Sequence, residues 1–204
     1  MLVAIAGSQG AGKSSILAEL AKQGYQTISR KTSRSILTDW NVTLDQINSD
    51  SDLTKKFQEE IIIRKFNDEI EAVHSPHVVF TERTYGDLFT YSLFSIGKYN
   101  EFNGWIDSYF KQCMMYQQSY HAVYYVTAGH FVPVADGVRA ANRHYSKLVD
   151  LAMLDVTQRM TMSKKLNIIT TPNLEERVAL ISSQIQGDWS AFDYTMKLKH
   201  NIDG

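Results

Sequence analysis

The 204-residue sequence has one cysteine, Cys113, and only three prolines. A single thiol excludes an internal disulfide, and the lack of a Pro- or Gly-rich linker favours one folded unit. The sequence also has almost no net charge, since 21 Lys and Arg face 22 Asp and Glu, so a general attraction to nucleic acid or membranes is not expected. No stretch approaches the ~20 apolar residues of a membrane span, and the opening run 2–6 is too short for a signal-peptide core. We therefore expect a soluble protein of the cytoplasm with no membrane partner.

Short apolar, β-branched runs alternate with longer stretches of helical periodicity, which predicts strands alternating with helices. Strands that are apolar throughout and separated by crossover helices are typical of a parallel sheet covered on both faces. We therefore predict an α/β fold, a three-layer sandwich around a mostly parallel five-stranded sheet. The predicted strands are 2–6, 25–29, 77–81, 122–126 and 167–170, and the predicted helices are 12–22, 51–74, 85–97, 99–119, 138–161 and 173–185.

The longest predicted helix covers residues 51–74, and the Ser-Pro pair at 75–76 ends it. Its large apolar side chains fall near one stripe, which we expect to face the core. They are Leu53, Phe57, Ile61, Ile62, Phe66, Ile70 and Val73.

A glycine-rich motif follows the first predicted strand, and it reads Gly-Ser-Gln-Gly-Ala-Gly-Lys-Ser over residues 7–14. It fits the phosphate-loop pattern in the required strand–loop–helix context. Its backbone N–H groups and the start of the next helix can surround phosphate oxygens, while Lys13 can bridge the β- and γ-phosphates and Ser14 can ligate Mg²⁺. We therefore predict a site for ATP and Mg²⁺ formed by Gly7, Ser8, Gln9, Gly10, Ala11, Gly12, Lys13, Ser14 and Ser15.

An acidic residue and an arginine, Glu82 and Arg83, end the third predicted strand. Because parallel strands end at one edge of the sheet, Glu82 should face the phosphate loop, where a carboxylate can hold a metal ion or take a proton. Most of the many aromatic residues between 85 and 125 are expected in the core. Tyr85 and Tyr91 are the candidates for stacking on an acceptor, because they follow this pair. The alternative interpretation of the segment is a helix cap formed by Thr84 or Asp87.

Two arginines, Arg139 and Arg143, follow the fourth predicted strand at i, i+4 spacing. On a helix they project from one face. Two guanidinium groups on one face suit the negative charge of phosphate oxygens. The alternative is that both are ordinary exposed helix residues.

Together with the phosphate loop, these segments resemble the small nucleoside and nucleotide kinases, and most of all the branch of the nicotinamide riboside kinase domain and related phage and bacterial kinases. Glu82–Arg83 is similar to an acidic–Arg pair of deoxynucleoside and thymidylate kinases, and Asp-Gly-Val-Arg at 136–139 is similar to a riboside kinase sequence. The resemblance implies a kinase domain over 1–187 with a helical lid at about 128–147, followed by a tail over 188–204. It also implies that Glu82 acts on Mg²⁺ or the attacking hydroxyl, that Arg83 holds phosphate or acceptor, and that Arg139 and Arg143 close over the transferring group. For a phage protein the location would be the host cytoplasm.

The segment after the second predicted strand departs from that family. Many nucleoside kinases have an acidic residue there, whereas this sequence has Arg30, Lys31 and Arg34. Three cations oppose an anionic base, but they suit an acceptor that already carries phosphate. The base would then be Glu82, with Asp39 and Asp87 as alternatives. A solvated basic loop is the other interpretation of this segment.

The leading hypothesis is an enzyme, a Mg²⁺- and ATP-dependent kinase that transfers the γ-phosphate to a hydroxyl or phosphate of a nucleotide-type acceptor, either a nucleoside monophosphate or a nucleotide in DNA. The expected acceptor contacts are Arg30, Lys31, Arg34, Arg83, Tyr85, Asp87 and Tyr91. Three alternatives remain: a kinase for a hydroxymethylated base or terminus in a polynucleotide, a nicotinamide riboside or nucleoside kinase, and a P-loop ATPase switch that acts through a partner. The oligomeric state stays open.

Overall fold

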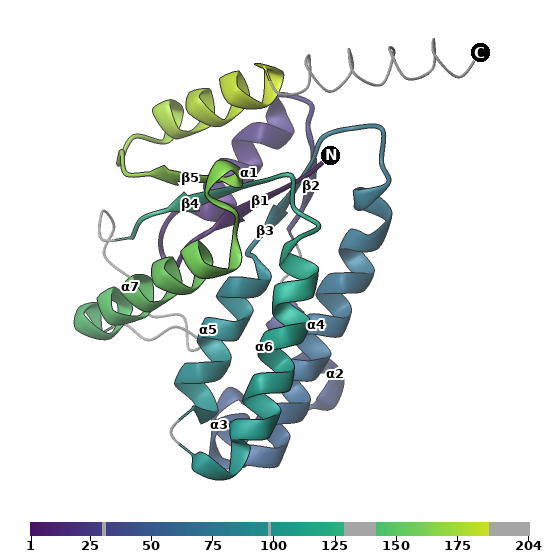
Figure 1. Cartoon of the computed structure of the whole chain (residues 1–204), viewed down its shortest axis with the longest axis vertical. Coiled ribbons are helices and arrows are strands. Elements are labelled where there is room, and N and C mark those ends of the chain that lie inside the picture. Colours follow the sequence, from purple (N-terminus) through teal and green to yellow (C-terminus); the bar gives the residue numbers. More distant parts are fainter. Residues whose placement is uncertain (30–31, 98, 129–141, 188–204) are drawn as a thin grey trace. The chain divides into compact units, whose positions relative to one another are not determined.

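A five-stranded parallel sheet forms the centre of the fold in the computed structural model (Figure 1). The structure describes residues 1–29, 32–97, 99–128 and 142–187, and of Arg143 only the backbone. The strand order is β2-β3-β1-β4-β5. The strands are β1 (Leu2–Ala6), β2 (Gln26–Ile28), β3 (Val79–Glu82), β4 (Ala122–Val126) and β5 (Leu166–Ile169). The α/β fold and its five predicted strands are therefore confirmed.

Helices cover the sheet on both faces and complete a three-layer sandwich (Figure 1). Helix α1 packs on β1, β2 and β3, while α4, α5 and α6 lie side by side on the other face, with α7 against α5 and with α2 and α3 against α4. The helices are α1 (Lys13–Lys22), α2 (Thr32–Trp40), α3 (Leu44–Ser49), α4 (Ser51–Val73), α5 (Tyr85–Ile96), α6 (Asn103–Gln117) and α7 (Arg143–Met160). Two short 3₁₀ helices, η1 (Asn100–Phe102) and η2 (Ser163–Lys165), connect them to their neighbours.

The central strands β1 and β4 are buried over their whole length, as their continuous apolar sequences predict. Strand β1 pairs with β3 in a register that sets Ile5 opposite Glu82. The loop that leaves β1 therefore begins beside the end of β3. This register brings the glycine-rich motif and the Glu82–Arg83 pair to the same edge of the sheet.

The sequence pattern predicts neither α2 nor α3. Helix α2 begins at Thr32, so Arg34 lies in its first turn, and Ile36 is its only buried residue. Helix α3 has six residues and a capping box. The Thr43 hydroxyl accepts from the backbone N–H of Gln46, and the side-chain oxygen of Gln46 accepts from the backbone N–H of Thr43. Both helices have too few apolar residues for a periodicity signal, although the Thr43-x-x-Gln46 spacing is a recognisable helix start.

The apolar stripe predicted for α4 is only partly correct. Phe57, Ile61 and Ile62 are buried, but Ile70 is 44% exposed. In its place the helix buries two charged residues, Lys65 and Glu69. They lie on the inward face of α4 together with the buried apolar residues, and their contacts there are not visible in the sequence.

The chain divides into two compact units, residues 1–170 and 171–204. The described part of the second unit contains a helix over 174–187. Asn173 caps this helix, because its side-chain oxygen accepts from the backbone of Glu176. Within the described ranges of both units, each helix is too short or too polar to span a membrane.

Candidate active site

The loop over 7–12 leaves β1 and enters α1 through three glycines with positive φ: Gly7 (132°), Gly10 (82°) and Gly12 (91°). At Gly7 glycine is required, because an added Cβ would lie 2.4 Å from the carbonyl oxygen of Val126. Gly12 is the N-cap of α1 and supplies no side-chain cap. The first N–H groups of α1 are thus available to an anion, as the phosphate-loop motif predicts.

Lys13 is the first residue of α1 and is only 4% exposed. Its Nζ donates to the carbonyl oxygen of Ser8 at 2.8 Å, so the lysine spans the loop. Burial and, after it, the charge of Arg83 lower the pKa of Lys13, while Asp87, Glu82 and Asp150 act in the opposite direction; the net result is a pKa of about 8. A polyphosphate beside Lys13 would favour its protonated form.

Glu82 connects three segments of the chain at the carboxyl edge of the sheet. The Ser14 hydroxyl lies 3.2 Å from each of its carboxylate oxygens, and Ser29, which follows β2, donates to one of them at 3.1 Å. The predicted proximity of Ser14 and Glu82 is therefore present. Ser29 was not predicted, and its only sequence signal is its position at the end of a strand.

Arg83 and Tyr91 form a second pair next to this group. The guanidinium carbon of Arg83 lies 5.0 Å from the centre of the Tyr91 ring. The backbone of Arg83 has a φ of 69°, a left-handed conformation that few residues with a side chain adopt. Neither Nη1 of Arg83 nor the hydroxyl of Tyr91, both buried atoms, has a hydrogen-bond partner within the described residues. Apart from their electrostatic interaction with each other, these two buried polar groups are available to a ligand.

Asp87 is completely buried in the first turn of α5. One carboxylate oxygen accepts from the backbone N–H of Gly7 at 3.3 Å, and the other accepts from the Thr84 hydroxyl at 2.8 Å. Thr84 is the N-cap of α5, as the capping interpretation predicts. Burial raises the pKa of Asp87, whereas the charges of Lys13 and Arg83 counteract that rise. In this structure Asp87 holds the start of the phosphate loop.

Other predicted site residues lie elsewhere or outside the described residues. Tyr85 is 1% exposed and packs against Tyr120 and Tyr116; the structure thus corrects its predicted contact with an acceptor, because the ring is part of the core. Arg34 is exposed and lines a groove of about 600 Å³ between α2 and α4. Arg30, Lys31, Arg139 and the side chain of Arg143 lie outside the described residues.

One further carboxylate near Lys13 has no sequence signal. Asp150 of α7 accepts from the Tyr125 hydroxyl at 2.9 Å and from the backbone N–H of Ala128 at 3.2 Å. It joins α7 to the end of β4, from which the segment with the predicted lid departs. Its charge acts on Lys13 and, after burial, contributes to the raised pKa of Tyr125.

The side chains at this edge fit a magnesium ion better than a transition metal. Hydroxyl and carboxylate oxygens are the ligands that Mg²⁺ prefers, and Ser14, Ser29 and Glu82 supply only oxygen. In the part of the chain that the structure describes, no three His, Cys, Asp or Glu side chains gather to hold a metal ion. This set suits an ion that is bound together with nucleotide phosphates.

Comparison with known proteins supports the same architecture. The AAA domain family matches residues 2–177. A deoxyadenosine kinase from M. mycoides with bound dATP superposes with a TM-score of 0.65 and 17% identity, over 91% of this chain and 100% of the kinase. The NadR protein in complex with NAD and AMP-PNP gives a TM-score of 0.65 and 14% identity, over 91% of this chain but 48% of NadR. No curated protein matches.

The family match over residues 2–177 includes all the residues described above for the site, and the shared fold has the same parallel sheet. The phosphate loop, the parallel sheet and the carboxylate beside the loop together give a P-loop α/β architecture, and this chain shares that fold with the deoxyadenosine kinase and NadR structures. The chain belongs to the AAA domain family.

Proposed function

We propose that the protein is a kinase that transfers the γ-phosphate of ATP to a nucleotide-type acceptor, either a nucleoside monophosphate or a nucleotide within DNA, with Mg²⁺ as its metal ion. The observation that supports this best is the contact between Ser14 and Glu82. It puts a carboxylate beside the start of α1, where a phosphate loop holds the β- and γ-phosphates.

The residues at the loop have separate roles in this proposal. The N–H groups of the loop and Lys13 hold the polyphosphate, and Ser14 and Glu82 hold Mg²⁺, which neutralises charge on the β- and γ-phosphates when it is bound. With a hydroxyl acceptor, its oxygen bonds to the γ-phosphorus while the bond to the β–γ bridging oxygen breaks. ADP leaves, and Glu82, where it acts as the base instead of holding Mg²⁺, takes the hydroxyl proton.

The acceptor would bind next to Arg83 and Tyr91. This position is supported by the two buried polar atoms, Nη1 and the tyrosine hydroxyl, that have no hydrogen-bond partner within the described residues. The predicted roles of Arg30, Lys31 and Arg34 in holding an acceptor phosphate, and of Arg139 and Arg143 in closing over the γ-phosphate, belong to the same proposal. Asp87 is reassigned to the phosphate loop, because its carboxylate bonds Gly7.

A transfer assay with γ-labelled ATP tests this function against nucleosides, monophosphates, oligonucleotides and hydroxymethylated DNA. The Lys13→Ala variant should lose transfer while its circular dichroism spectrum stays that of the wild type. Lys22→Ala is the matched control, since Lys22 ends the same helix and its side chain is 71% exposed. Undiminished transfer by Lys13→Ala would refute the proposal. A rate of ATP hydrolysis that no acceptor changes, but that a protein partner increases, would also refute it.

A nucleoside acceptor is the second candidate. It is supported by the names of the structural neighbours, a deoxyadenosine kinase and a NadR protein that has been seen in complex with NR. The sequence after β2 supports a phosphorylated acceptor instead, because Ser29 and the basic residues that follow it take the place of the acid that many nucleoside kinases have there. Arg34→Ala separates the two: it should raise KM for monophosphates and leave KM for nucleosides unchanged.

A further inference from the structure

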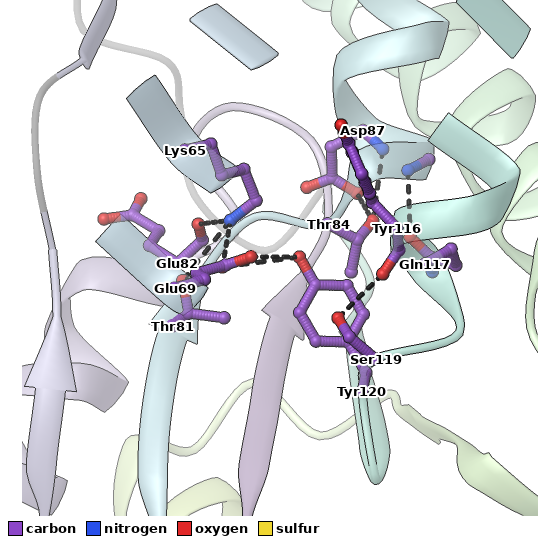
Figure 2. A network of polar contacts seen from close by, with 11 residues as sticks. Lys65, Glu69, Thr81, Glu82, Thr84, Asp87, Tyr116, Gln117, Ser119 and Tyr120 are labelled. Carbon is purple, nitrogen blue, oxygen red and sulfur yellow. Dashed lines mark hydrogen bonds and ion pairs between the residues drawn. The ribbon is translucent and has the colours of Figure 1, made fainter. Parts of the chain in front are cut away.

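A lysine and a glutamate of α4 are buried under the end of β3. Lys65 and Glu69 are one turn apart, and their side chains are 8% and 3% exposed. Figure 2 shows both side chains turned toward Thr81 and Glu82. Replacement of a buried ion pair by apolar residues of similar size is often neutral or stabilising, so stability alone does not account for this pair.

The hydrogen bonds of Lys65 use all three protons of its ammonium group. Nζ lies 2.6 Å from the carboxylate of Glu69, 3.3 Å from the Thr81 hydroxyl and 3.2 Å from the carbonyl oxygen of Glu82 (Figure 2). Glu69 also accepts from Thr81 at 2.6 Å and from the Tyr120 hydroxyl at 3.1 Å. The network thus holds Lys65 from one side and points one of its protons at the backbone of the site.

The carbonyl of Glu82 belongs to the same peptide group as the N–H of Arg83. That N–H donates to the carbonyl oxygen of Ile5 in β1 at 2.9 Å. The peptide is therefore bonded at both ends, by the sheet on one side and by Lys65 on the other. Its orientation matters because Arg83 has a positive φ of 69°, and such a conformation persists only when its surroundings hold it.

This peptide group lies between the two side chains that define the site. Glu82 leaves it toward Ser14 and Ser29, and Arg83 leaves it toward Tyr91. A rotation of the peptide would move the carboxylate and the guanidinium group together. A small misplacement of such groups lowers the rate of group transfer more than it lowers binding.

We propose that Lys65, oriented by Glu69, is a positioning residue that fixes the Glu82–Arg83 peptide and through it the direction of the Glu82 and Arg83 side chains. The effect on transfer rests on the proposed kinase function, whereas the effect on the peptide does not.

The test uses the double variant Lys65→Met/Glu69→Gln. Methionine fills the volume of the lysine stem, and glutamine still accepts from Thr81 and Tyr120 without leaving a buried charge unpaired. Lys56→Met/Glu60→Gln is the matched control, because it makes the same two changes at the same spacing on a more exposed part of α4. Both are made in the full chain.

Two measurements are expected to change together in Lys65→Met/Glu69→Gln. The kcat for phosphate transfer should fall about ten- to hundred-fold, with the KM for ATP within about two-fold of wild type. Hydrogen exchange of the Arg83 amide should become faster, while exchange of β1 and β4 amides stays as in the wild type and in the control.

A kcat within two-fold of wild type, or an unchanged exchange rate at Arg83, would overturn the proposal. A uniform rise in exchange over β1, β3 and β4 would also overturn it, because it would show a general structural role. If the wild type transfers phosphate to no acceptor, the proposed function fails, and the exchange rate at Arg83 alone decides whether Lys65 holds this peptide.

Discussion

The Gly7→Ala substitution provides a sharp test of the loop geometry. Two costs combine at this position. The φ of 132° is a conformation that glycine alone adopts readily, and forcing another residue into it costs about 1–3 kcal/mol. The new methyl group would also lie 2.4 Å from the Val126 carbonyl oxygen, and overpacking of this kind costs about 1–3 kcal/mol. We expect the free energy of unfolding to fall by about 2–6 kcal/mol, against a total of about 5–15 kcal/mol for a typical domain.

Urea unfolding measures this loss, and the Gly24→Ala variant provides the control. Gly24 has a φ of 91°, but nothing lies within 4 Å of an added Cβ, so that variant carries only the torsional cost of about 1–2 kcal/mol. Gly7→Ala should therefore be the less stable of the two. It should also bind ATP more weakly under conditions where it is folded, because the first residue of the loop is displaced. A Gly7→Ala protein as stable as Gly24→Ala would refute the reasoning.

Three further predictions follow from buried charges and hydroxyls. The pKa of free Lys13 is lowered to about 8, and phosphates bind its ammonium form, so ATP binding should be accompanied by proton uptake. Calorimetry in buffers of different ionisation enthalpy should show an uptake of about half a proton at pH 8, an uptake that falls toward zero at pH 6 and is absent in Lys13→Arg. Equal uptake at both pH values would contradict this prediction. Asp87→Asn leaves the charges of Lys13 and Arg83 without their buried counter-charge, so it should lower the free energy of unfolding by about 3–5 kcal/mol and increase proton uptake at pH 8. A melting temperature of Asp87→Asn equal to that of the wild type would contradict the assigned role of Asp87. Tyr125→Phe removes the hydrogen bond to Asp150 and should cost about 1 kcal/mol in urea unfolding, an effect that a Tyr145→Phe control at an exposed position should not reproduce.

The parts of the fold that depend on local sequence patterns were predictable. The five strands are short apolar runs, and the phosphate loop is a contiguous motif whose glycines adopt the positive φ values that the motif requires. Glu82 was predictable for a related reason: it ends a strand, and parallel strands end at one edge. Helix α2 was not predictable from the sequence, because it buries only Ile36 and so gives no apolar periodicity.

The contacts that complete the site depend on pairs of residues far apart in the sequence. Asp87 looks like a helix cap locally, and its bond to Gly7 exists only because β1 and β3 are neighbours. Tyr85 looks like a stacking residue because it follows Arg83, but α5 turns its ring inward. Lys65 and Glu69 interrupt the apolar pattern of α4, and nothing in that pattern shows that Glu69 bonds Lys65 or that Lys65 bonds the carbonyl of Glu82.

The bond from Lys13 to the Ser8 carbonyl has a consequence for the order of events when nucleotide arrives. The Ser8 carbonyl holds the Lys13 ammonium group within its own loop, so the loop needs no folding step in order to receive an anion. Capture should then be a single encounter, with an observed rate that grows in proportion to nucleotide concentration and does not level off at a slow rearrangement. The ammonium group has only to exchange one oxygen partner for another.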